Sequence, residues 1–285
     1  MNPAGKALWY VENHFGEELS LDDVADAAGV TRYHLSRVFG IAFGHSVMGY
    51  VRGRRLTEAA RMLAGGANDI LAVALEAGYG SHEAFTRAFG EQFGMTPEAL
   101  RARGNLDNIS LTEPIKMDES LDLQLEAPRF ETLKTLLIAG VGQHYTAETS
   151  AGIPAQWQKI VPYLGSIPGQ VGWTTYGVVC QTDDAGNTEY VCGVEVSDFT
   201  KVQPELRRLR IPDQSYAVFA HRGHVSTVRR TWHTIWNKWL PESGYRVAEA
   251  PELERYGKEF DPRSGNGGFE IWIPVKSKEN GTGQR

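Results

Sequence analysis

The chain has 285 residues, a hydrophobic share of 41%, a charged share of 22% and a formal net charge of −6 at pH 7. This length is sufficient for two domain cores, and the composition is that of an ordinary soluble protein. No apolar run approaches the roughly 20 residues of a membrane-spanning helix, and residues 1–19 lack the basic start and apolar core of a secretion signal. The sequence therefore predicts a cytoplasmic protein with no membrane partner.

Two copies of one pattern lie near the N-terminus. The first copy is TRYHLSRVFG at residues 31–40, and the second is SHEAFTRAFG at residues 81–90. Each copy follows a short helix of small residues and a turn that contains a glycine. Each copy begins at a good N-cap, Thr31 or Ser81. This predicts two helix-turn-helix units. Two such units on one chain can enter successive major grooves of DNA, whereas one unit reads only a few base pairs.

In each predicted helix-turn-helix unit, the second helix has an apolar stripe and a polar face on the opposite side. In the first unit the stripe is Leu35, Val38 and Phe39, which we expect to pack inward. The polar faces carry residue types that contact base edges and phosphates. The predicted DNA-reading residues are Arg32, Tyr33, Ser36 and Arg37 in the first unit and His82, Glu83, Thr86 and Arg87 in the second. A solvated polar face is the alternative for either helix alone, and the duplication favours DNA reading.

One long helix is predicted between the two units, over residues 47–63. It would hold the units at a fixed separation. Its arginines, of which Arg54 and Arg55 are the central pair, are expected to meet phosphates, which position a protein on DNA without specifying sequence. The alternative is that these arginines only keep the helix soluble.

The charge of this region is lower than DNA binding suggests. Residues 1–104 contain ten Lys and Arg against twelve Asp and Glu, a net charge near −2. A basic domain is the usual expectation for a DNA-binding protein, and it is not met here. The arginines are concentrated on the connecting and reading helices, so a local basic stripe is expected to bind phosphates with modest, salt-sensitive affinity.

Residues 6–104 resemble the DNA-binding domain of the AraC/XylS family of bacterial transcription regulators. The stretches that carry the resemblance are LDDVA at 21–25, RRLTEAARML at 54–63 and AFTRAF at 84–89 through FGMTP at 93–97. The resemblance implies binding to double-stranded DNA at a degenerate site of about two helical turns, with RNA polymerase as a partner. It also implies that the reading residues lie on the two polar faces named above.

A second domain follows a linker at residues 105–120. Over residues 121–277 a strand-helix-strand-strand pattern occurs twice, with strands at 130–145, 172–181 and 189–196 echoed at 206–222, 247–256 and 268–276, and helices at 154–164 and 226–240. Neither half could cover its own sheet, so we expect the halves to pair about a pseudo-twofold axis and to form a cleft at their junction. The predicted fold class is an all-α tandem helix-turn-helix domain at 1–104 followed by a duplicated α+β domain. Residues 278–285 are predicted to be a disordered tail.

One carboxylate interrupts the repeat. Glu270 stands where the first half has Val191, and the alternation places it on one strand face with Trp272. A carboxylate beside aromatic rings in a cleft can bind a lipophilic cation, with about 0.5 to 2 kcal/mol per cation-π contact. An edge glutamate in water is the alternative.

Residues 121–277 resemble the GyrI-like small-molecule-binding domain. The stretches KWLPESGY at 238–245, PELERY at 251–256 and FEIWIPV at 269–275 carry the resemblance. It implies a hydrophobic effector, a class that includes cations, and a glutamate at the centre of an aromatic pocket, a place that Glu270 matches. The candidate wall residues are Trp173, Tyr176, Tyr256 and Trp272. The tryptophans at 232, 236 and 239 share one helix at i, i+4 and i+7, which is more often core packing than ligand contact.

No other catalytic or cofactor signature occurs. The chain has no phosphate-binding Gly-Lys-Ser/Thr loop, no nucleophile elbow and no His-Glu-x-x-His helix, so no catalytic residue, metal or cofactor is predicted. Cys180 and Cys192 could face each other on neighbouring strands and are expected to be reduced. Three interpretations remain open: an effector-sensing regulator, a regulator whose second domain is an effector-free docking module, and a regulator whose second domain hydrolyses reactive lipophilic compounds. Fusion to a complete DNA reader favours sensing.

Overall fold

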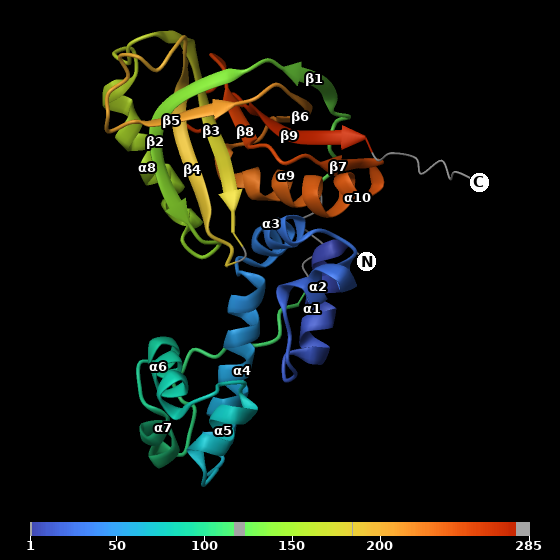
Figure 1. Cartoon of the computed structure of the whole chain (residues 1–285), viewed down its shortest axis with the longest axis vertical. Helices are drawn as coiled ribbons and strands as arrows, with labels where there is room; N and C mark the ends of the chain where they lie inside the picture. The colour runs from blue at the N-terminus through green and yellow to red at the C-terminus, as the bar shows by residue number, and fades with distance from the viewer. Residues whose placement is uncertain (1, 117–122, 184, 278–285) are drawn as a thin grey trace, which may run out of the picture.

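The computed structural model describes residues 2–116, 123–183 and 185–277. An all-helical N-terminal part and a C-terminal part built on one antiparallel sheet lie end to end, and the first few helices touch the C-terminal part directly (Figure 1). The start of the predicted second domain, the end of its linker and the predicted tail lie outside the described residues. Among the described residues, no helix combines the length and apolar character needed to cross a bilayer.

The N-terminal part contains the two predicted helix-turn-helix units. The helices are α1 (Pro3–His14), α2 (Leu21–Ala28), α3 (Arg32–Phe43), α4 (Val47–Ala64), α5 (Ile70–Glu76), α6 (His82–Phe93) and α7 (Pro97–Arg103). The side chain of Thr31 accepts a hydrogen bond from His34 N, and that of Ser81 accepts one from Ala84 N, so both predicted N-caps are confirmed. Gly29 ends α2 with φ 71°, a left-handed conformation that favours glycine.

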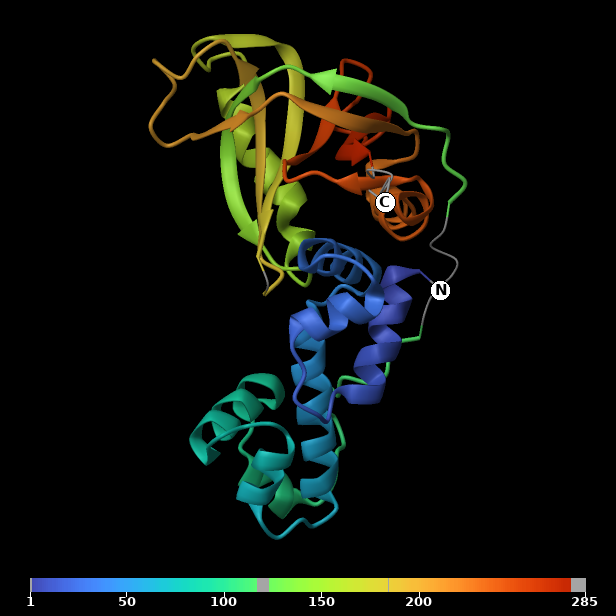
Figure 2. The ribbon, with the colours of Figure 1, turned by 45° about the vertical axis from the view of Figure 1, so that its right-hand side comes forward.

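Each unit has its own hydrophobic core, and α4 contributes to both. The first core gathers α1, α2 and α3 around residues such as Leu35 and Phe39 with Tyr50 of α4. The second gathers α5, α6 and α7 around Phe85 and Phe89 with the other end of α4. The predicted connecting helix is therefore confirmed, and it fixes the two units rigidly because it is continuous through both cores (Figure 2).

The segment after α7 packs back along α4. Thr112 N donates to Thr57 Oγ1 at 2.9 Å, and Ile115 N donates to the Tyr50 hydroxyl at 3.1 Å. Leu111 joins the second helical core. The described part of the predicted linker thus belongs to the surface of the N-terminal part.

The C-terminal part repeats strand-helix-strand-strand, as predicted. Its elements are β1 (Arg129–Leu133), β2 (Leu136–Tyr145), α8 (Ile153–Ile160), β3 (Gln170–Thr182), β4 (Thr188–Val196), β5 (Arg207–Ile211), β6 (Gln214–His221), α9 (Val228–Thr234), α10 (Leu240–Glu242), β7 (Tyr245–Val247), β8 (Glu252–Tyr256) and β9 (Phe269–Ser277). A π-helical turn at Ile235–Trp239 joins α9 to α10. Three strands predicted as continuous are each broken in two, giving the pairs β1 and β2, β5 and β6, and β7 and β8.

The breaks let the two halves exchange strands. The sheet order is β1-β6-β9-β8-β3-β4-β2-β5, with β7 paired to β9. The short strand β1 leaves the first half to pair with β6 of the second, and β5 leaves the second half to pair with β2 of the first. The halves also join directly where β3 pairs with β8. This arrangement has the predicted pseudo-twofold character, and the junction of β3 and β8 lies at its centre.

The prediction that the two cysteines face each other is wrong. In the register of β3 against β4, Cys180 lies opposite Glu189, and Cys192 lies opposite Gly177. Thr182 pairs with Thr188, so the hairpin is symmetrical about residue 185 and not about Gly186, and a register irregularity between Cys180 and Thr182 shifts the strands by one further residue. Both thiols are free and buried.

Candidate functional site

The second reading helix, α6, presents its predicted face to solvent. His82, Glu83 and Arg87 are exposed, Thr86 is half-buried, and Phe85 with Phe89 anchors the helix in the core. The ring of His82 lies 3.2 Å from a carboxylate oxygen of Glu98 on α7. Helix α6 lies at the far end of α4 from the C-terminal part, and none of the described residues of that part covers it (Figure 1).

The first reading helix, α3, is placed very differently. Arg37 Nε donates to Glu252 Oε1 at 3.0 Å, and Arg37 Nη2 donates to Glu252 Oε2 at 2.6 Å. The Tyr33 hydroxyl donates to the same Oε1 at 2.7 Å. The Arg37 side chain is 14% exposed and that of Glu252 is 0% exposed. Two predicted DNA-reading residues are therefore bound to β8 of the C-terminal part.

Aromatic rings complete the environment of Arg37. Its guanidinium carbon lies 5.6 Å from the ring centroid of Trp232 and 5.8 Å from that of Trp236, both within cation-π range. Burial lowers the pKa of Arg37, but the Glu252 carboxylate outweighs burial and the pKa is raised. Burial and the charge of Glu252 also raise the pKa of Tyr33, so its hydroxyl stays protonated and donates.

Apolar and polar contacts continue along α3. Val38 and Ala42 are buried in a core shared with Trp236 and the sheet of the C-terminal part. Arg229 of α9 donates from Nε to the carbonyl of Ile41 at 2.9 Å and from Nη2 to that of Ala42 at 3.1 Å. These are carbonyls of the last turn of α3, where a cation also complements the helix dipole. The C-terminal part thus contacts both the polar face of α3 and its C-terminal end.

The other two predicted reading residues of α3 differ in exposure. Ser36 is buried, so it cannot reach a base edge in this conformation. Arg32 is exposed, and its Nε lies 3.4 Å from Asp22 Oδ1. The prediction of an exposed four-residue reading edge is therefore wrong for this arrangement of α3, because the C-terminal part covers most of that edge.

The structure corrects the phosphate-binding prediction for Arg54 and Arg55. The Arg54 side chain is 6% exposed, pairs with Glu12 at 3.0 Å and lies over the Phe15 ring. Arg55 donates to the backbone carbonyls of Phe15 and Glu17. Both guanidinium groups tie α4 to the end of α1 and the loop after it, because these are the nearest acceptors for a cation on the inner side of α4.

Glu270 does not lie in an aromatic pocket. Arg129 Nη2 lies 2.7 Å from Glu270 Oε1, Arg255 Nη1 lies 3.3 Å from Oε2, and Trp272 Nε1 donates to Oε2 at 3.0 Å. Its side chain is 26% exposed. Burial raises the pKa of Glu270, but the hydrogen bonds from Trp272 and Arg129 and the charge of Arg129 outweigh it, so the pKa is lowered. Two arginines already neutralise this carboxylate, which removes the reason for a cationic guest.

Only two of the four predicted wall residues lie near Glu270. Trp173 is 75% exposed, whereas Tyr176 lies opposite Arg255, the partner of Glu270, on the other face of the sheet from Tyr256. Trp272 contacts Glu270 through its N–H and stacks edge-on with Tyr216. Of the four predicted wall residues, Tyr256 is the one that lies beside a different carboxylate.

That carboxylate is Glu254, on β8 at the junction of the two halves. Its Oε2 accepts from the hydroxyls of Tyr190 at 2.7 Å and Tyr256 at 3.0 Å, and its Oε1 accepts from Trp232 Nε1 at 3.1 Å. Trp157 adds a fourth ring, 5.2 Å from Tyr256 in edge-to-face contact. We call these four rings and Glu254 the carboxylate box. Each of the three donors is neutral, so none of these hydrogen bonds to the buried carboxylate comes from a cation.

A glycine in β3 leaves room for the carboxylate box. A Cβ atom on Gly177 would lie 2.0 Å from the Tyr190 hydroxyl oxygen and 2.8 Å from Glu254 Oε2. Glycine is required because Gly177 pairs directly with Glu254 across the junction. Burial and the charge of Glu254 raise the pKa values of Tyr190 and Tyr256, so both hydroxyls remain donors.

Comparison with known proteins identifies both parts. Residues 126–276 match the GyrI-like small molecule binding domain, and residues 24–103 match a helix-turn-helix domain. The chain belongs to the GyrI-like family. It is 26% identical over 282 residues to the transcriptional regulator Rob of Salmonella typhimurium, which covers 94% of this chain and 96% of Rob. The right origin-binding protein of Escherichia coli K12 gives the same identity and coverage.

Among solved structures, the fold of SAV2435, described as bound to tetraphenylphosphonium, is similar with a TM-score of 0.46 and 20% identity. The match covers 55% of this chain and 98% of that one. The predicted combination of an AraC-type DNA-binding domain with a GyrI-like domain is confirmed. The chain is a DNA-binding transcriptional regulator that carries a small-molecule-binding domain.

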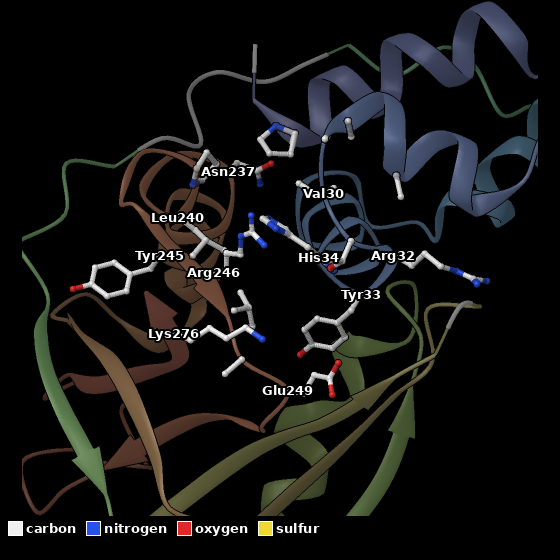
Figure 3. A pocket seen from close by; sticks show the side chains of 18 of the residues that line it. Val30, Arg32, Tyr33, His34, Asn237, Leu240, Tyr245, Arg246, Glu249 and Lys276 are labelled. Carbon is white, nitrogen blue, oxygen red and sulfur yellow. The ribbon is translucent and has the colours of Figure 1, made fainter. Parts of the chain in front are cut away.

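A cleft of about 2170 Å³ lies beside this contact and is lined by residues of both the GyrI-like domain and the first helix-turn-helix unit. In Figure 3, Tyr33 and His34 of α3 face the GyrI-like domain across this cleft, whereas Arg32 extends away from it. The opposite wall carries Arg246 and Lys276 of β7 and β9. The cleft gives solvent a route along the side of the docked helix.

The sequence prediction missed Glu252 and Glu254, although their signal was present. In the stretch from Pro251 to Tyr256, alternation along a strand places Glu252, Glu254 and Tyr256 on one face. Tyr256 was already a predicted wall residue. Glu252 and Glu254 alternate with Tyr256 on a strand at the junction of the halves. This pattern predicts the position of the carboxylate box better than Glu270 does.

Proposed function

We propose that this regulator senses a lipophilic cation at the carboxylate box of its GyrI-like domain. The single observation that carries the proposal is the buried Glu254 carboxylate, which lies among Trp157, Tyr190, Trp232 and Tyr256 and, among the described residues, accepts its side-chain hydrogen bonds from neutral donors. A buried carboxylate without a cation is costly. A cation with apolar substituents would relieve that cost and gain cation-π contacts with the rings.

On the DNA side, we propose that the reading residues are those of the two polar faces. In α6 these are His82, Glu83, Thr86 and Arg87, and in α3 they are Arg32, Tyr33, Ser36 and Arg37 when that helix is free of the GyrI-like domain. Similarity to transcriptional regulators over nearly the whole chain supports RNA polymerase as a partner and the cytoplasm as the place of action.

We propose that the GyrI-like domain binds its ligand without turnover. A general base needs a free lone pair directed at a positioned water. Tyrosine and tryptophan donors take three of the about four acceptor sites of the Glu254 carboxylate and hold it in place, which leaves little of it to direct a water. Incubation of the chain with a lipophilic epoxide, followed by chromatography of the products, tests this proposal, and sustained hydrolysis that depends on Glu254 would contradict it.

Isothermal titration calorimetry tests the effector class. Tetraphenylphosphonium is the cationic probe, and triphenylphosphine oxide is a neutral probe with similar rings. We expect the intact chain to prefer the cation. Glu254→Gln should weaken cation binding by about tenfold to a hundredfold, the cost of a lost charged contact, and should leave binding of the neutral probe unchanged.

Glu270→Gln is the matched control, because it removes a carboxylate on the neighbouring strand whose charge Arg129 and Arg255 already balance. We expect its affinity for tetraphenylphosphonium to stay within about twofold of the parent. Equal losses in both variants, or equal affinity for both probes, would contradict charge recognition at Glu254. The same titration separates a sensor from an effector-free docking module, which would bind neither probe.

A further inference from the structure

The docked first reading helix brings a cation of its own to the carboxylates of β8. We propose that Arg37 is the resident cation of the effector site, and that α3 and a lipophilic cation compete for Glu252, Glu254 and the rings beside them. The inference rests on the proposed function of the carboxylate box and adds its regulation: binding of the effector releases α3 to the major groove.

Arg37 supplies the features that the carboxylate box is suited to bind. Its positive charge lies over the rings of Trp232 and Trp236, and its donors engage Glu252. Trp232 belongs to both arrangements, because its ring faces Arg37 while its N–H donates to Glu254. Glu252 and Glu254 are two residues apart on one strand and on the same face. One guanidinium therefore lies close to two buried carboxylates.

The docked state cannot use α3 for DNA reading. Arg recognises guanine through two donors of its planar group, and Arg37 Nε and Nη2 are both bonded to Glu252. The Tyr33 hydroxyl is bonded to the same carboxylate. Helix α6 stays free at the other end of α4 (Figure 2). The chain in this state can place one reading helix in a major groove, and release of α3 would supply the second.

The interface retains unsatisfied polar groups, as expected of a contact that must open. Among the described residues, Trp236 Nε1 and Asn237 Nδ2 are buried without a hydrogen-bond acceptor. Both lie on the helix that α3 packs against. Such groups regain hydrogen bonds when the interface opens to water, which lowers the cost of release. The same coupling is reciprocal, so DNA that captures α3 must raise the affinity for the cation.

Hydrogen exchange on the full-length chain tests the release directly. With saturating tetraphenylphosphonium, we expect amide exchange in α3 to rise, while exchange in α6 stays unchanged and serves as the internal control. Hydroxyl-radical footprints on a duplex selected from a randomised library should lengthen from about one helical turn to about two when the cation is added. Binding of the cation with no change in α3 and no longer footprint overturns the inference and leaves the proposed function standing.

Two variants approach the contact from opposite sides. Glu252→Gln keeps the shape and removes the charge that holds Arg37, so the longer footprint should appear without the cation. Arg37→Met removes the competitor. If the docked state of α3 is about ten times more populated than the released state, the affinity for tetraphenylphosphonium should rise by about tenfold. Arg263→Met, which changes an exposed arginine in the loop before β9, is the control and should not alter cation affinity.

The outcomes separate the two proposals. An unchanged or weaker cation affinity in Arg37→Met means that Arg37 does not compete, and overturns the inference even if Glu252→Gln fails to fold. Failure of the intact chain and of Arg37→Met to bind tetraphenylphosphonium overturns the effector class, and with it the competition. If only Arg37→Met binds the probe, the competition is supported, because the resident cation then excludes the ligand.

Discussion

Arg37 Nη2 lies 2.6 Å from Glu252 Oε2, although the two residues are 215 positions apart in the chain. The first belongs to the helix of the first helix-turn-helix unit that we propose reads DNA, and the second to a strand at the centre of the small-molecule-binding domain. A direct ion pair thus connects the two functions of this regulator. It requires no relay through the hydrophobic core, because the side chain proposed to read DNA is itself the contact.

Arg87 on α6 tests DNA reading in the unit that is exposed. Arg87→Ala should weaken binding to a selected duplex by about 1 to 3 kcal/mol, the cost of a lost bidentate base contact. Circular dichroism should show an unchanged fold, because the side chain is solvent-exposed. Arg263→Ala, which removes an exposed arginine of the GyrI-like domain, is the control for nonspecific charge effects. Fluorescence anisotropy measures both, and equal affinities for the two variants would remove Arg87 from the reading set.

Arg54 should behave as a structural residue. Its guanidinium group pairs with Glu12, donates to the carbonyl of Thr112 and lies over Phe15. Arg54→Ala leaves Glu12 without its cation, and we expect unfolding to become easier by about 2 to 4 kcal/mol. Urea unfolding followed by circular dichroism measures this difference. A variant of unchanged stability with weaker DNA binding would show instead that Arg54 contacts phosphates.

Acid should weaken the contribution of Glu270. Its pKa in the folded chain lies below the ordinary value of 4.5, so the folded state binds this proton less readily than the unfolded state does. The stabilisation is fully present above pH 4.5 and is lost as the pH falls through the lower folded pKa. Melting temperatures of the parent should therefore drop more steeply than those of Glu270→Gln between about pH 5 and pH 3. Parallel curves would show that the arginine pairs contribute nothing.

Both cysteines should resist modification in the folded chain. Burial is the main cause that raises the pKa of Cys180 to about 12 and that of Cys192 to about 11. At neutral pH the reactive thiolate is therefore rare, and the sulfur atoms are also inaccessible. Ellman's reagent should react slowly with the native chain and rapidly after unfolding in guanidinium chloride. Rapid reaction of the native chain would contradict this burial.

The local architecture was predictable because it depends on short-range patterns. Capping at Thr31 and Ser81, the apolar stripes of the reading helices and the repeated strand-helix-strand-strand order follow from neighbouring residues. The breaks in the strands, such as that at Lys134 and Thr135, were not predictable, because they depend on which half each strand joins.

The site was less predictable than the fold. Glu270 and Glu254 both lie beside aromatic residues in the sequence, and only the register of the strands decides which of them meets arginines. Arg129, which pairs with Glu270, lies 141 positions away. The docking of α3 on the GyrI-like domain could not be predicted from the sequence either. The polar face of α3 has the same residues whether it contacts a base edge or Glu252.

Helix α4 has 18 residues and is therefore about 27 Å long. It runs without interruption from one helix-turn-helix unit to the other, and the described residues of the GyrI-like domain contact the first unit alone. In the proposed competition an effector therefore changes whether α3 is available, but it leaves the distance between the two units unchanged. Operators whose two half-sites are moved apart by inserted base pairs should remain poor targets at every concentration of inducer.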